Sequence, residues 1–312
     1  MPGIRRISVI GGGYVGRGLA IQFAHGGYEV ALYNRTRQSS SAAREGIQFF
    51  LGLLEKNGLY SEKESREILS RIKPTIDFGE AASDADFVIE SVSEDLLLKQ
   101  DIFERLDSLC PPPAILASDT SGLRLSDIGR KVRRKEKLIT VHHYTPAPLR
   151  PVVEVVRGPE TSEETFQTTK TLLESVGKDV ANVKESLGHI GVRITTAIRR
   201  EAIYMLERGV AAPEDIDRVA YGLGILPVFA GMDASGLDVF LSIHEYLQKD
   251  LDNRESPSPL LRRKVENGEL GMKSGVGFFR WDADSAKKAT EQRIKALIHR
   301  IKERKMLQGS DS

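Results

Sequence analysis

The sequence predicts a doubly wound α/β domain followed by an all-helical domain. Three observations predict it. Short apolar runs alternate with helical patterns in the first half of the chain, a glycine-rich turn follows the first run, and no strand series recurs after residue 187. Continuous apolar strands that are each followed by a helix are typical of a parallel sheet covered on both faces. Right-handed crossovers then wind such a sheet in both directions.

The elements of the first half follow in order. Residues 4–10 form an apolar run that ends in glycines, which predicts a buried strand. Residues 14–25 continue with apolar side chains at helical spacing, and residues 29–33 form the next short apolar run. Further strands are expected at residues 87–89, 115–117, 138–141 and 152–156.

The pattern changes near residue 187. Apolar residues fall at helical spacing over 188–208, and Pro213 followed by two acids is typical of a helix start. We therefore expect a dinucleotide-binding domain over 1–186 and a helical C-terminal domain over 187–312. Further helices are expected at residues 234–252, 259–267 and 285–305.

Composition excludes several classes of function. The 312 residues carry 45 Lys and Arg against 44 Asp and Glu, a net charge of +1, which argues against a general nucleic-acid binder. A single cysteine, Cys110, excludes a disulfide framework and a cysteine-rich zinc site. No apolar run approaches the roughly 20 residues that cross a bilayer. We expect a cytoplasmic protein with no signal peptide and no membrane partner.

A glycine-rich turn predicts the cofactor. Gly11, Gly13 and Gly16 fit the pattern G-x-G-x-x-G, with a predicted strand before them and a predicted helix after them. Such glycines let the backbone turn tightly and approach a pyrophosphate, whose charge meets the positive end of the helix. In this context the pattern indicates a Rossmann-type dinucleotide site.

The end of the second predicted strand bears on the type of dinucleotide. Sites for NAD usually carry an acid there, which bonds the ribose 2′-hydroxyl. Here Asn34 is followed by Arg35 and Arg37, which would accept a 2′-phosphate. We therefore expect NADP rather than NAD. The alternative is that both arginines are solvated surface residues.

A histidine and a glutamate are candidates for acid–base chemistry. His142 ends a predicted strand, and Glu154 lies in the next one. Strand ends in an open parallel sheet line the ligand crevice. A histidine there can take a hydroxyl proton as hydride leaves, and a carboxylate on its other nitrogen fixes the tautomer. The alternative is that neither residue takes part in chemistry. His142 is then a structural histidine whose hydrogen bonds are made at the strand end, and Glu154 is an exposed surface residue. No metal site is expected, since His142 and His143 are adjacent in a strand and point to opposite faces.

The chain resembles the 3-hydroxyacyl-CoA dehydrogenase family, whose relatives include carnitine dehydrogenase and the lens protein lambda-crystallin. The resemblance covers almost the whole chain, and several separate motifs occur in the right order. They are the glycine turn at 9–16, Glu90-Ser91-Val92-Ser93-Glu94 with Lys99, Ser118-Asp119-Thr120-Ser121, His142-His143-Tyr144-Thr145-Pro146, Val153-Glu154-Val155-Val156, Pro213-Glu214-Asp215, Gly236-Leu237-Asp238 and Gly271-Met272-Lys273-Ser274-Gly275.

The resemblance implies roles for particular residues. His142 matches the family's catalytic histidine, Glu154 the carboxylate that orients it, and Ser121 the serine that bonds the reacting oxygen. Glu94 and Lys99 match residues that line the nicotinamide end of the cofactor site. The resemblance also implies a homodimer formed through the helical domain.

Three departures from the family pattern fall in the expected substrate pocket. Val192 stands where the family has a substrate-binding asparagine, His189 stands where it has phenylalanine, and Thr145 replaces the asparagine of H-F-F-N-P. Loss of such a donor costs on the order of 2–4 kcal/mol of transition-state stabilisation unless it is replaced. His189 either replaces the missing donor or is a buried structural histidine.

The sequence thus predicts an NAD(P)-dependent oxidoreductase that interconverts a 3-hydroxy and a 3-keto group. Its expected substrate is an acyl-CoA or a related β-hydroxy acid, with His142 as general acid and base. One alternative is an imine or iminium reductase on the same scaffold, because an apolar Val192 suits a substrate that needs fewer donors. The other is a catalytically silent cofactor-binding protein.

Overall fold

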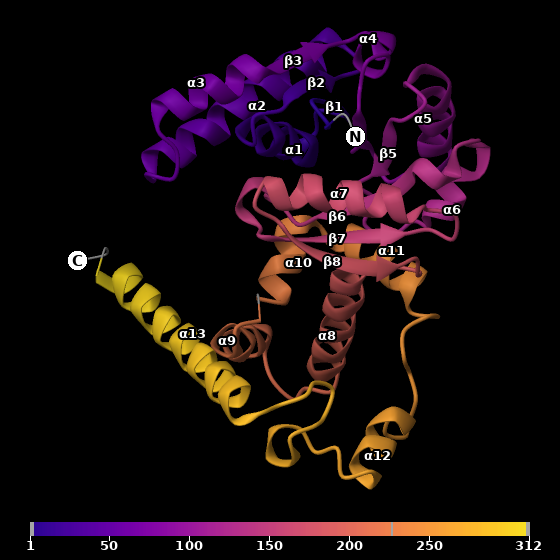
Figure 1. Cartoon of the computed structure of the whole chain (residues 1–312). Helices are drawn as coiled ribbons and strands as arrows, with labels where there is room; N and C mark the ends of the chain where they lie inside the picture. Colours follow the sequence, from indigo (N-terminus) through magenta and orange to yellow (C-terminus); the bar gives the residue numbers. More distant parts are fainter. Residues whose placement is uncertain (1–2, 226, 310–312) are drawn as a thin grey trace. The chain divides into compact units, whose positions relative to one another are not determined.

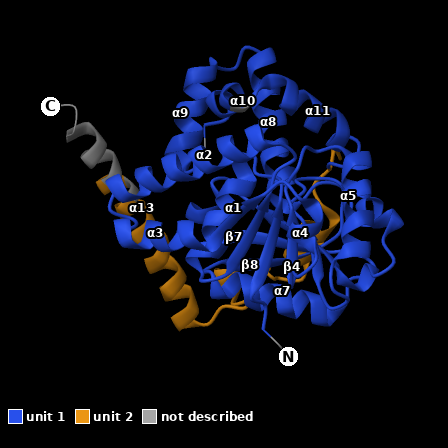
Figure 2. Cartoon of the chain, turned by 90° about the horizontal axis from the view of Figure 1, so that it is seen from above, with its two compact units in different colours: residues 1–251 blue, residues 252–312 orange. Residues whose placement is uncertain are grey.

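The structure is a computed structural model, and it describes residues 3–225 and 227–309. The chain forms two compact units, which divide between Leu251 and Asp252 (Figure 2). The helices over 190–247 thus belong to the same compact unit as the sheet. The expected domain division between residues 186 and 187 stays a prediction.

The first unit is built on an eight-stranded sheet, with the order β3-β2-β1-β4-β5-β6-β7-β8 (Figure 1). The order 3-2-1-4-5-6 is the doubly wound arrangement that the alternating pattern predicts. All neighbouring strands from β3 to β6 are parallel. The strands are β1 (Arg6–Ile10), β2 (Glu29–Tyr33), β3 (Ile72–Thr75), β4 (Phe87–Glu90), β5 (Ile115–Ser118), β6 (Leu138–His143), β7 (Val152–Arg157) and β8 (Asp179–Lys184).

The doubly wound sheet is confirmed as mostly parallel, and the parallel arrangement that the sequence predicted fails at one pair of strands. β6 and β7 are antiparallel, and His142 lies directly opposite Glu154 in their register. Only the short 3-10 helix η3 (Ala147–Leu149) separates these strands. A parallel return needs a crossover of a dozen or more residues, which this connection does not provide.

Helices cover both faces of the sheet. Alternate residues of one strand enter different apolar cores, as Val9 and Ile10 do, because successive strand side chains point to opposite faces. One core joins the sheet to α1, α2, α3 and α7, and the other joins it to α4, α5 and α6. The helices are α1 (Tyr14–His25), α2 (Arg37–Lys56), α3 (Glu62–Arg71), α4 (Phe78–Ala82), α5 (Leu96–Leu109), α6 (Leu125–Ile128) and α7 (Glu163–Ser175).

The rest of the first unit is a helical segment with its own small core. Ala202, Ile216, Met232 and Phe240 meet in this core, and each comes from a different helix. The absence of further strands over this part of the described chain agrees with the predicted helical domain. Its helices are α8 (Ile190–Glu207), α9 (Pro213–Leu223), α10 (Phe229–Ser235) and α11 (Leu237–Leu247).

The described part of the second unit contains the α-helices α12 (Pro259–Glu266) and α13 (Ala283–Gly309) and the short 3-10 helix η4 (Met272–Ser274). Between them, Val276 forms isolated β-bridges with Gly271 and with Arg280. Within the described residues, no helix is both long enough and apolar enough to span a bilayer.

Candidate active site at the carboxyl edge of the sheet

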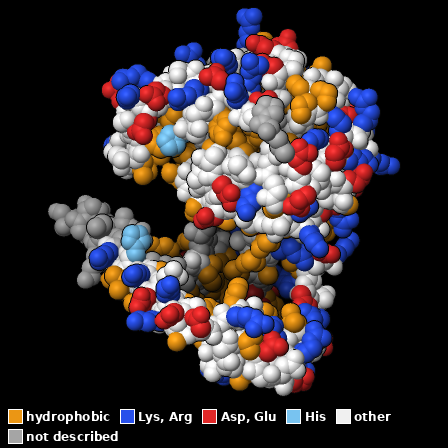
Figure 3. Space-filling view, viewed as in Figure 1, with side chains coloured by type: hydrophobic (Ala, Val, Ile, Leu, Met, Phe, Trp, Pro, Cys, Tyr) orange, Lys and Arg blue, Asp and Glu red, His pale blue; other side chains and the backbone are white. Residues whose placement is uncertain are grey.

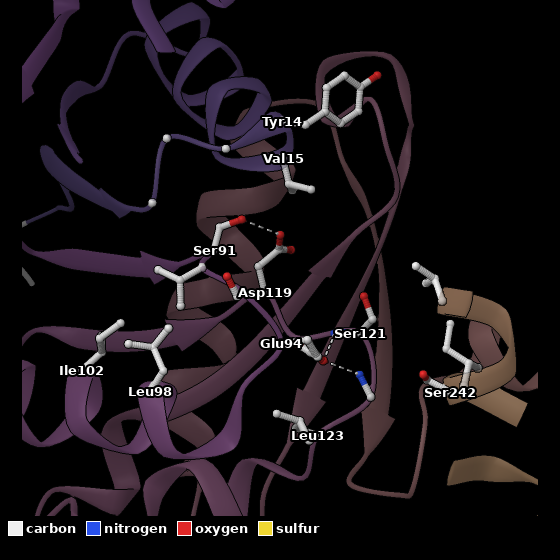
Figure 4. A pocket seen from close by; sticks show the side chains of 18 of the residues that line it. Tyr14, Val15, Ser91, Glu94, Leu98, Ile102, Asp119, Ser121, Leu123 and Ser242 are labelled. Atoms are coloured by element: carbon white, nitrogen blue, oxygen red, sulfur yellow. Dashed lines mark hydrogen bonds between the residues drawn. The ribbon is translucent and has the colours of Figure 1, made fainter. Parts of the chain in front are cut away.

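A cleft of about 1110 Å³ opens at the carboxyl ends of the strands, and all of its described lining residues belong to the first unit. Gly11–Val15 form one wall and α11 contributes Ser242 to another (Figure 4). Ligands bind at this edge of an open parallel sheet, near the point where the strand order reverses. The cleft therefore lies where the sequence placed the cofactor.

The glycine turn is built for close approach of backbone segments. A side-chain carbon on Gly16 would lie 1.8 Å from the Gly11 carbonyl oxygen, so only glycine fits. Gly11 has a φ of +112°, which favours glycine, and Gly13 caps α1 with open space beside it. Gly12 and Gly13 line the cleft at the amino end of α1. This cradle fits a pyrophosphate, because a helix N-terminus and a glycine turn offer unpaired N–H groups.

Asn34 and Arg35 follow β2 and line the same cleft. The Asn34 side chain is buried against Gly12, and its Nδ2 has no hydrogen-bond partner among the described residues. A buried donor without a partner fits a site that a ligand completes. Arg35 is exposed at the cleft, whereas Arg37, the first residue of α2, does not line it.

Glu94 fixes the loop that carries Ser121. Its Oε1 accepts a hydrogen bond from the Thr120 hydroxyl, and it accepts the N–H groups of Ser121 at 3.1 Å and Gly122 at 3.3 Å (Figure 4). Ser121 itself is exposed in the cleft. A carboxylate bound to several backbone donors holds a loop rigidly. Glu94 therefore lines the cleft and positions Ser121.

Lys99 lies beneath this loop, not in the cleft. It is 1% exposed, and its Nζ lies 2.7 Å from Glu90 Oε1 and 3.3 Å from Glu94 Oε2. Lys99 is thus connected to the cleft through Glu94, which lines it, and through Glu90, whose Oε1 also accepts the N–H of the lining residue Val92 at 2.7 Å.

The structure brings His142 and Glu154 together. Glu154 Oε2 lies 2.8 Å from His142 Nδ1, and both side chains are almost fully buried. A carboxylate only accepts, so Nδ1 carries the proton and Nε2 keeps its lone pair. Glu154 Oε1 also accepts the Gly191 N–H at 2.9 Å, from the first turn of α8.

The surroundings of Glu154 keep it ionised. Burial alone would raise its pKa, but the hydrogen bonds from His142 and the Gly191 N–H outweigh burial and lower the pKa. An ionised Glu154 stabilises a proton on His142. The neighbouring His143 takes a different partner, since its Nδ1 lies 3.1 Å from Asp119 Oδ1. The two adjacent histidines therefore face different carboxylates.

His189 lies against His142 and is fully buried. The two ring centroids are 5.3 Å apart, and His189 Nε2 donates to the Thr120 carbonyl at 3.0 Å. Burial, and next the charge of His142, lower the pKa of His189. A neutral His189 carries one ring proton, and its Nε2 uses that proton in the hydrogen bond to Thr120. Its Nδ1 is therefore an acceptor. It therefore does not supply the donor that Val192 lacks.

The three residues expected to contact the substrate do not all line the cleft. Val192 lines the cleft, whereas Thr145 is exposed outside its lining, and its carbonyl accepts a hydrogen bond from Arg150. His142 and Glu154 do not belong to the described cleft lining either. His189 packs against His142, and it lies in the chain between Gly188 and Val192. Both of these residues line the cleft.

Sequence reasoning missed two residues of the site. The Tyr144 ring lies 5.0 Å from the His142 ring, and the Tyr246 hydroxyl of α11 donates to the Gly122 carbonyl at 3.1 Å. The proximity of Tyr144 to His142 in the sequence was an available signal. Tyr246 had none, because 124 residues separate it from Gly122.

Two sequence models of one family match almost the whole chain. The 3-hydroxyacyl-CoA dehydrogenase NAD-binding domain matches residues 6–186, and the C-terminal domain of that family matches residues 188–281. The chain belongs to the 3-hydroxyacyl-CoA dehydrogenase family. It is thus an oxidoreductase of the NAD-dependent 3-hydroxyacyl-CoA dehydrogenase type, and this confirms the enzyme class that the sequence predicted.

Members of this family with similar sequences include a probable 3-hydroxybutyryl-CoA dehydrogenase from Bacillus subtilis. It is 37% identical over 283 residues, which cover 89% of this chain and 98% of the relative. A 5-formyl-3-hydroxy-2-methylpyridine 4-carboxylate 5-dehydrogenase from Mesorhizobium japonicum is 32% identical over 301 residues, covering 95% of this chain and 96% of that protein. A crystal structure of an (S)-3-hydroxybutyryl-CoA dehydrogenase from Ralstonia eutropha superposes with a TM-score of 0.76 at 29% identity. It covers 89% of this chain and 99% of that one.

Proposed function

We propose that this enzyme interconverts the 3-hydroxy and 3-keto groups of an acyl thioester of the acyl-CoA class. The observation that carries the proposal is the buried His142–Glu154 pair, which His189 connects to Thr120, the residue before Ser121. In oxidation, the Nε2 lone pair of His142 takes the hydroxyl proton, and in reduction the protonated ring returns it. Glu154 holds the tautomer and supports the positive ring, while the Ser121 hydroxyl bonds the reacting oxygen. The nicotinamide dinucleotide, when bound, supplies or accepts the hydride.

The glycine turn and the segment after β2 would hold this dinucleotide. We infer that its pyrophosphate lies at Gly11–Gly13, its ribose near Asn34, and its reactive end toward Glu94 and Ser121. Glu94 would line the nicotinamide end of the site, and Lys99 would act indirectly, through its ion pairs with Glu90 and Glu94.

The charges at the substrate end favour a thioester over a free β-hydroxy acid. Among the described lining residues, Glu94, Asp119 and Asp238 carry carboxylates, and the cations are Arg35 and Arg105. Arg35 follows Asn34 at the cofactor end, and the Arg105 guanidinium stacks on Phe78, 3.9 Å from the ring centroid. A free carboxylate at the substrate end would meet acids and no cation. A neutral thioester avoids that penalty.

Turnover measurements test this function. We expect the purified enzyme to oxidise reduced nicotinamide cofactor with acetoacetyl-CoA and to leave free acetoacetate almost untouched. Turnover of acetoacetate but not of acetoacetyl-CoA would overturn the thioester assignment.

We propose NADP as the preferred cofactor within this NAD-binding fold. Asn34 lacks the charge that would repel a 2′-phosphate, and exposed Arg35 lines the cleft beside it. A comparison of kcat/KM for NADPH and NADH tests the preference, together with Asn34→Asp, which should favour NADH. A related crystal structure is described as an NAD+-dependent enzyme at 32% identity, and a wild-type preference for NADH would place this chain with it.

One observation favours a second substrate class, the imines. Val192 offers no hydrogen bond in the cleft, and the nearby carboxylates would stabilise an iminium cation. Reduction of a cyclic imine, with acetoacetyl-CoA inert, would favour this alternative.

We also propose a homodimer formed through the helical segment. Large apolar side chains are exposed along α9, among them Val219 at 62% and Leu223 at 71%. Basic and acidic side chains, by contrast, are interspersed over the sheet part of the face in Figure 3, which offers no single-sign surface for nucleic acid. Light scattering should give a dimer mass that Leu223→Asp reduces.

A cytoplasmic location completes the proposal, and cell fractionation tests it.

A further inference from the structure

We propose that Tyr246 is a positioning residue for Ser121. Its hydroxyl ties α11 of the helical segment to the loop that carries Ser121, and it thereby keeps that serine in place for the reacting oxygen. The inference rests on the proposed role of Ser121 in the reaction.

Glu94 holds the amide groups of this loop, but it divides one oxygen among three donors. Its Oε1 accepts the Thr120 hydroxyl and the N–H groups of Ser121 at 3.1 Å and Gly122 at 3.3 Å. A carboxylate oxygen has two lone pairs, so three donors cannot all bond it at full strength. The position of Ser121 therefore depends on further contacts of the loop.

The helical segment holds the carbonyl groups of the same loop. The Tyr246 hydroxyl donates to the Gly122 carbonyl at 3.1 Å, and His189 Nε2 donates to the Thr120 carbonyl at 3.0 Å. Donors from α11 and from the residue before α8 thus reach the carbonyl groups on both sides of Ser121. Within this set, Tyr246 is the donor that also lines the cleft.

Close packing places Tyr246 against the loop. A side-chain carbon on Gly122 would lie 3.7 Å from Tyr246 Cε1, which is ordinary contact, so the ring lies against Gly122. The Gly188 N–H approaches the Gly122 carbonyl oxygen at 3.4 Å. A side-chain carbon on Gly188 would lie 2.6 Å from Leu247 Cδ2, and Gly188 has a φ of +67°. Glycine at this position therefore lets α11 approach the loop.

The direction of the Tyr246 hydrogen bond is fixed. A carbonyl oxygen only accepts, so the Tyr246 hydroxyl is the donor. Burial is the main cause that raises the pKa of Tyr246 above its ordinary value of 10.0. The hydroxyl therefore keeps its proton at neutral pH, and the contact persists there.

Tyr246→Phe removes the hydroxyl and keeps the ring. With Ser121 held less well, kcat for acetoacetyl-CoA should fall about 5–20-fold, less than the roughly 100-fold that a misplacement of about 1 Å costs. The dissociation constant of the dinucleotide should not change, because the glycine turn keeps its contacts. In a Ser121→Ala background the same change should alter kcat about twofold or less. Independent effects of the two changes would overturn the inference.

Amide hydrogen exchange tests the position of the loop without substrate. Exchange of the Ser121 and Gly122 amides should be several-fold faster in Tyr246→Phe than in the wild type, and exchange in β1 should be unchanged. Equal rates at Ser121 and Gly122 would overturn the inference. Failure of the proposed reaction is a separate result, because it shows as a wild type, or a Ser121→Ala variant, whose turnover contradicts the assigned role.

Tyr28→Phe is the matched control. The Tyr28 hydroxyl is also hydrogen-bonded, 2.7 Å from Ser175 Oγ, but it lies outside the cleft lining. Its loss should leave kcat and the exchange of the Ser121 loop at wild-type values. A control that changes both as much as Tyr246→Phe would show that the effect is not specific to Tyr246, and would contradict the inference.

Discussion

Lys99 and Glu90 form an ion pair of 2.7 Å under the cleft, with exposed side-chain fractions of 1% and 0%. Ser118 donates to the other Glu90 oxygen at 2.8 Å, so the carboxylate is bonded on both sides. Burial still raises the pKa of Glu90, although Lys99 opposes the shift. Each charge in this pair is therefore tolerated because the other is present.

Lys99→Met should destabilise the protein by about 3–5 kcal/mol, because it leaves Glu90 buried without its cation. The double variant Glu90→Gln with Lys99→Met removes both charges and should recover part of the loss. Chemical denaturation measures both values. A single variant as stable as the wild type would mean that Glu90 takes up a proton without penalty.

His142→Ala should lower kcat by about 10²–10⁴-fold, the usual contribution of a positioned acid–base group. The dissociation constant of the dinucleotide should change little, because the residues assigned to hold it lie on the glycine turn and after β2. Stopped-flow turnover and fluorescence titration measure the two quantities. Undiminished turnover would remove His142 from the chemistry.

Glu154→Gln should change both catalysis and the pH dependence of stability. The folded-state pKa of Glu154 is lowered from its ordinary value of 4.5, so ionised Glu154 stabilises the fold above that pH. This stabilisation is lost as the pH falls through the folded-state pKa. The difference in unfolding free energy between wild type and variant should therefore be largest near neutral pH and shrink below about pH 4.5. A difference that grows on acidification would contradict this assignment.

The local pattern was enough to predict the sheet and the cofactor turn. Gly11 and Gly16 sit where a side chain would clash with backbone atoms, and the spacing of the glycine pattern reflects this constraint. Buried strands appear in the sequence as apolar runs. The antiparallel return of β7 was missed because the prediction used the strands and not the length of their connection. That register places His142 opposite Glu154, so the sequence could name the two residues but not their contact.

Contacts made by distant segments were beyond the sequence. Lys99 matched a cofactor-lining residue, but its burial depends on Glu90 and Glu94, which only the fold brings to it. The sequence left two roles possible for His189, a substrate donor or a buried structural histidine. The hydrogen bond from His189 Nε2 to the Thr120 carbonyl shows that its ring proton already has a partner. Both outcomes depend on hydrogen-bond partners that sequence spacing does not contain.

Val192→Asn should restore a hydrogen-bond donor to the cleft. Val192 and Ser121 both line the cleft, and the neighbouring neutral His189 offers only an acceptor, so it does not replace the missing amide donor. If the substrate is a thioester, the added donor should raise kcat/KM for acetoacetyl-CoA by about 10–10²-fold, less than a fully placed donor supplies.

Val192→Thr is the matched control, because threonine keeps the shape of valine and its hydroxyl reaches less far than the amide. It should give a smaller gain, and the two variants should bind the dinucleotide equally well. A fall in acetoacetyl-CoA turnover in Val192→Asn, with imine reduction unaffected, would contradict the thioester assignment. In that case the apolar Val192 serves a substrate that carries its own hydrogen-bond donor at the reacting end.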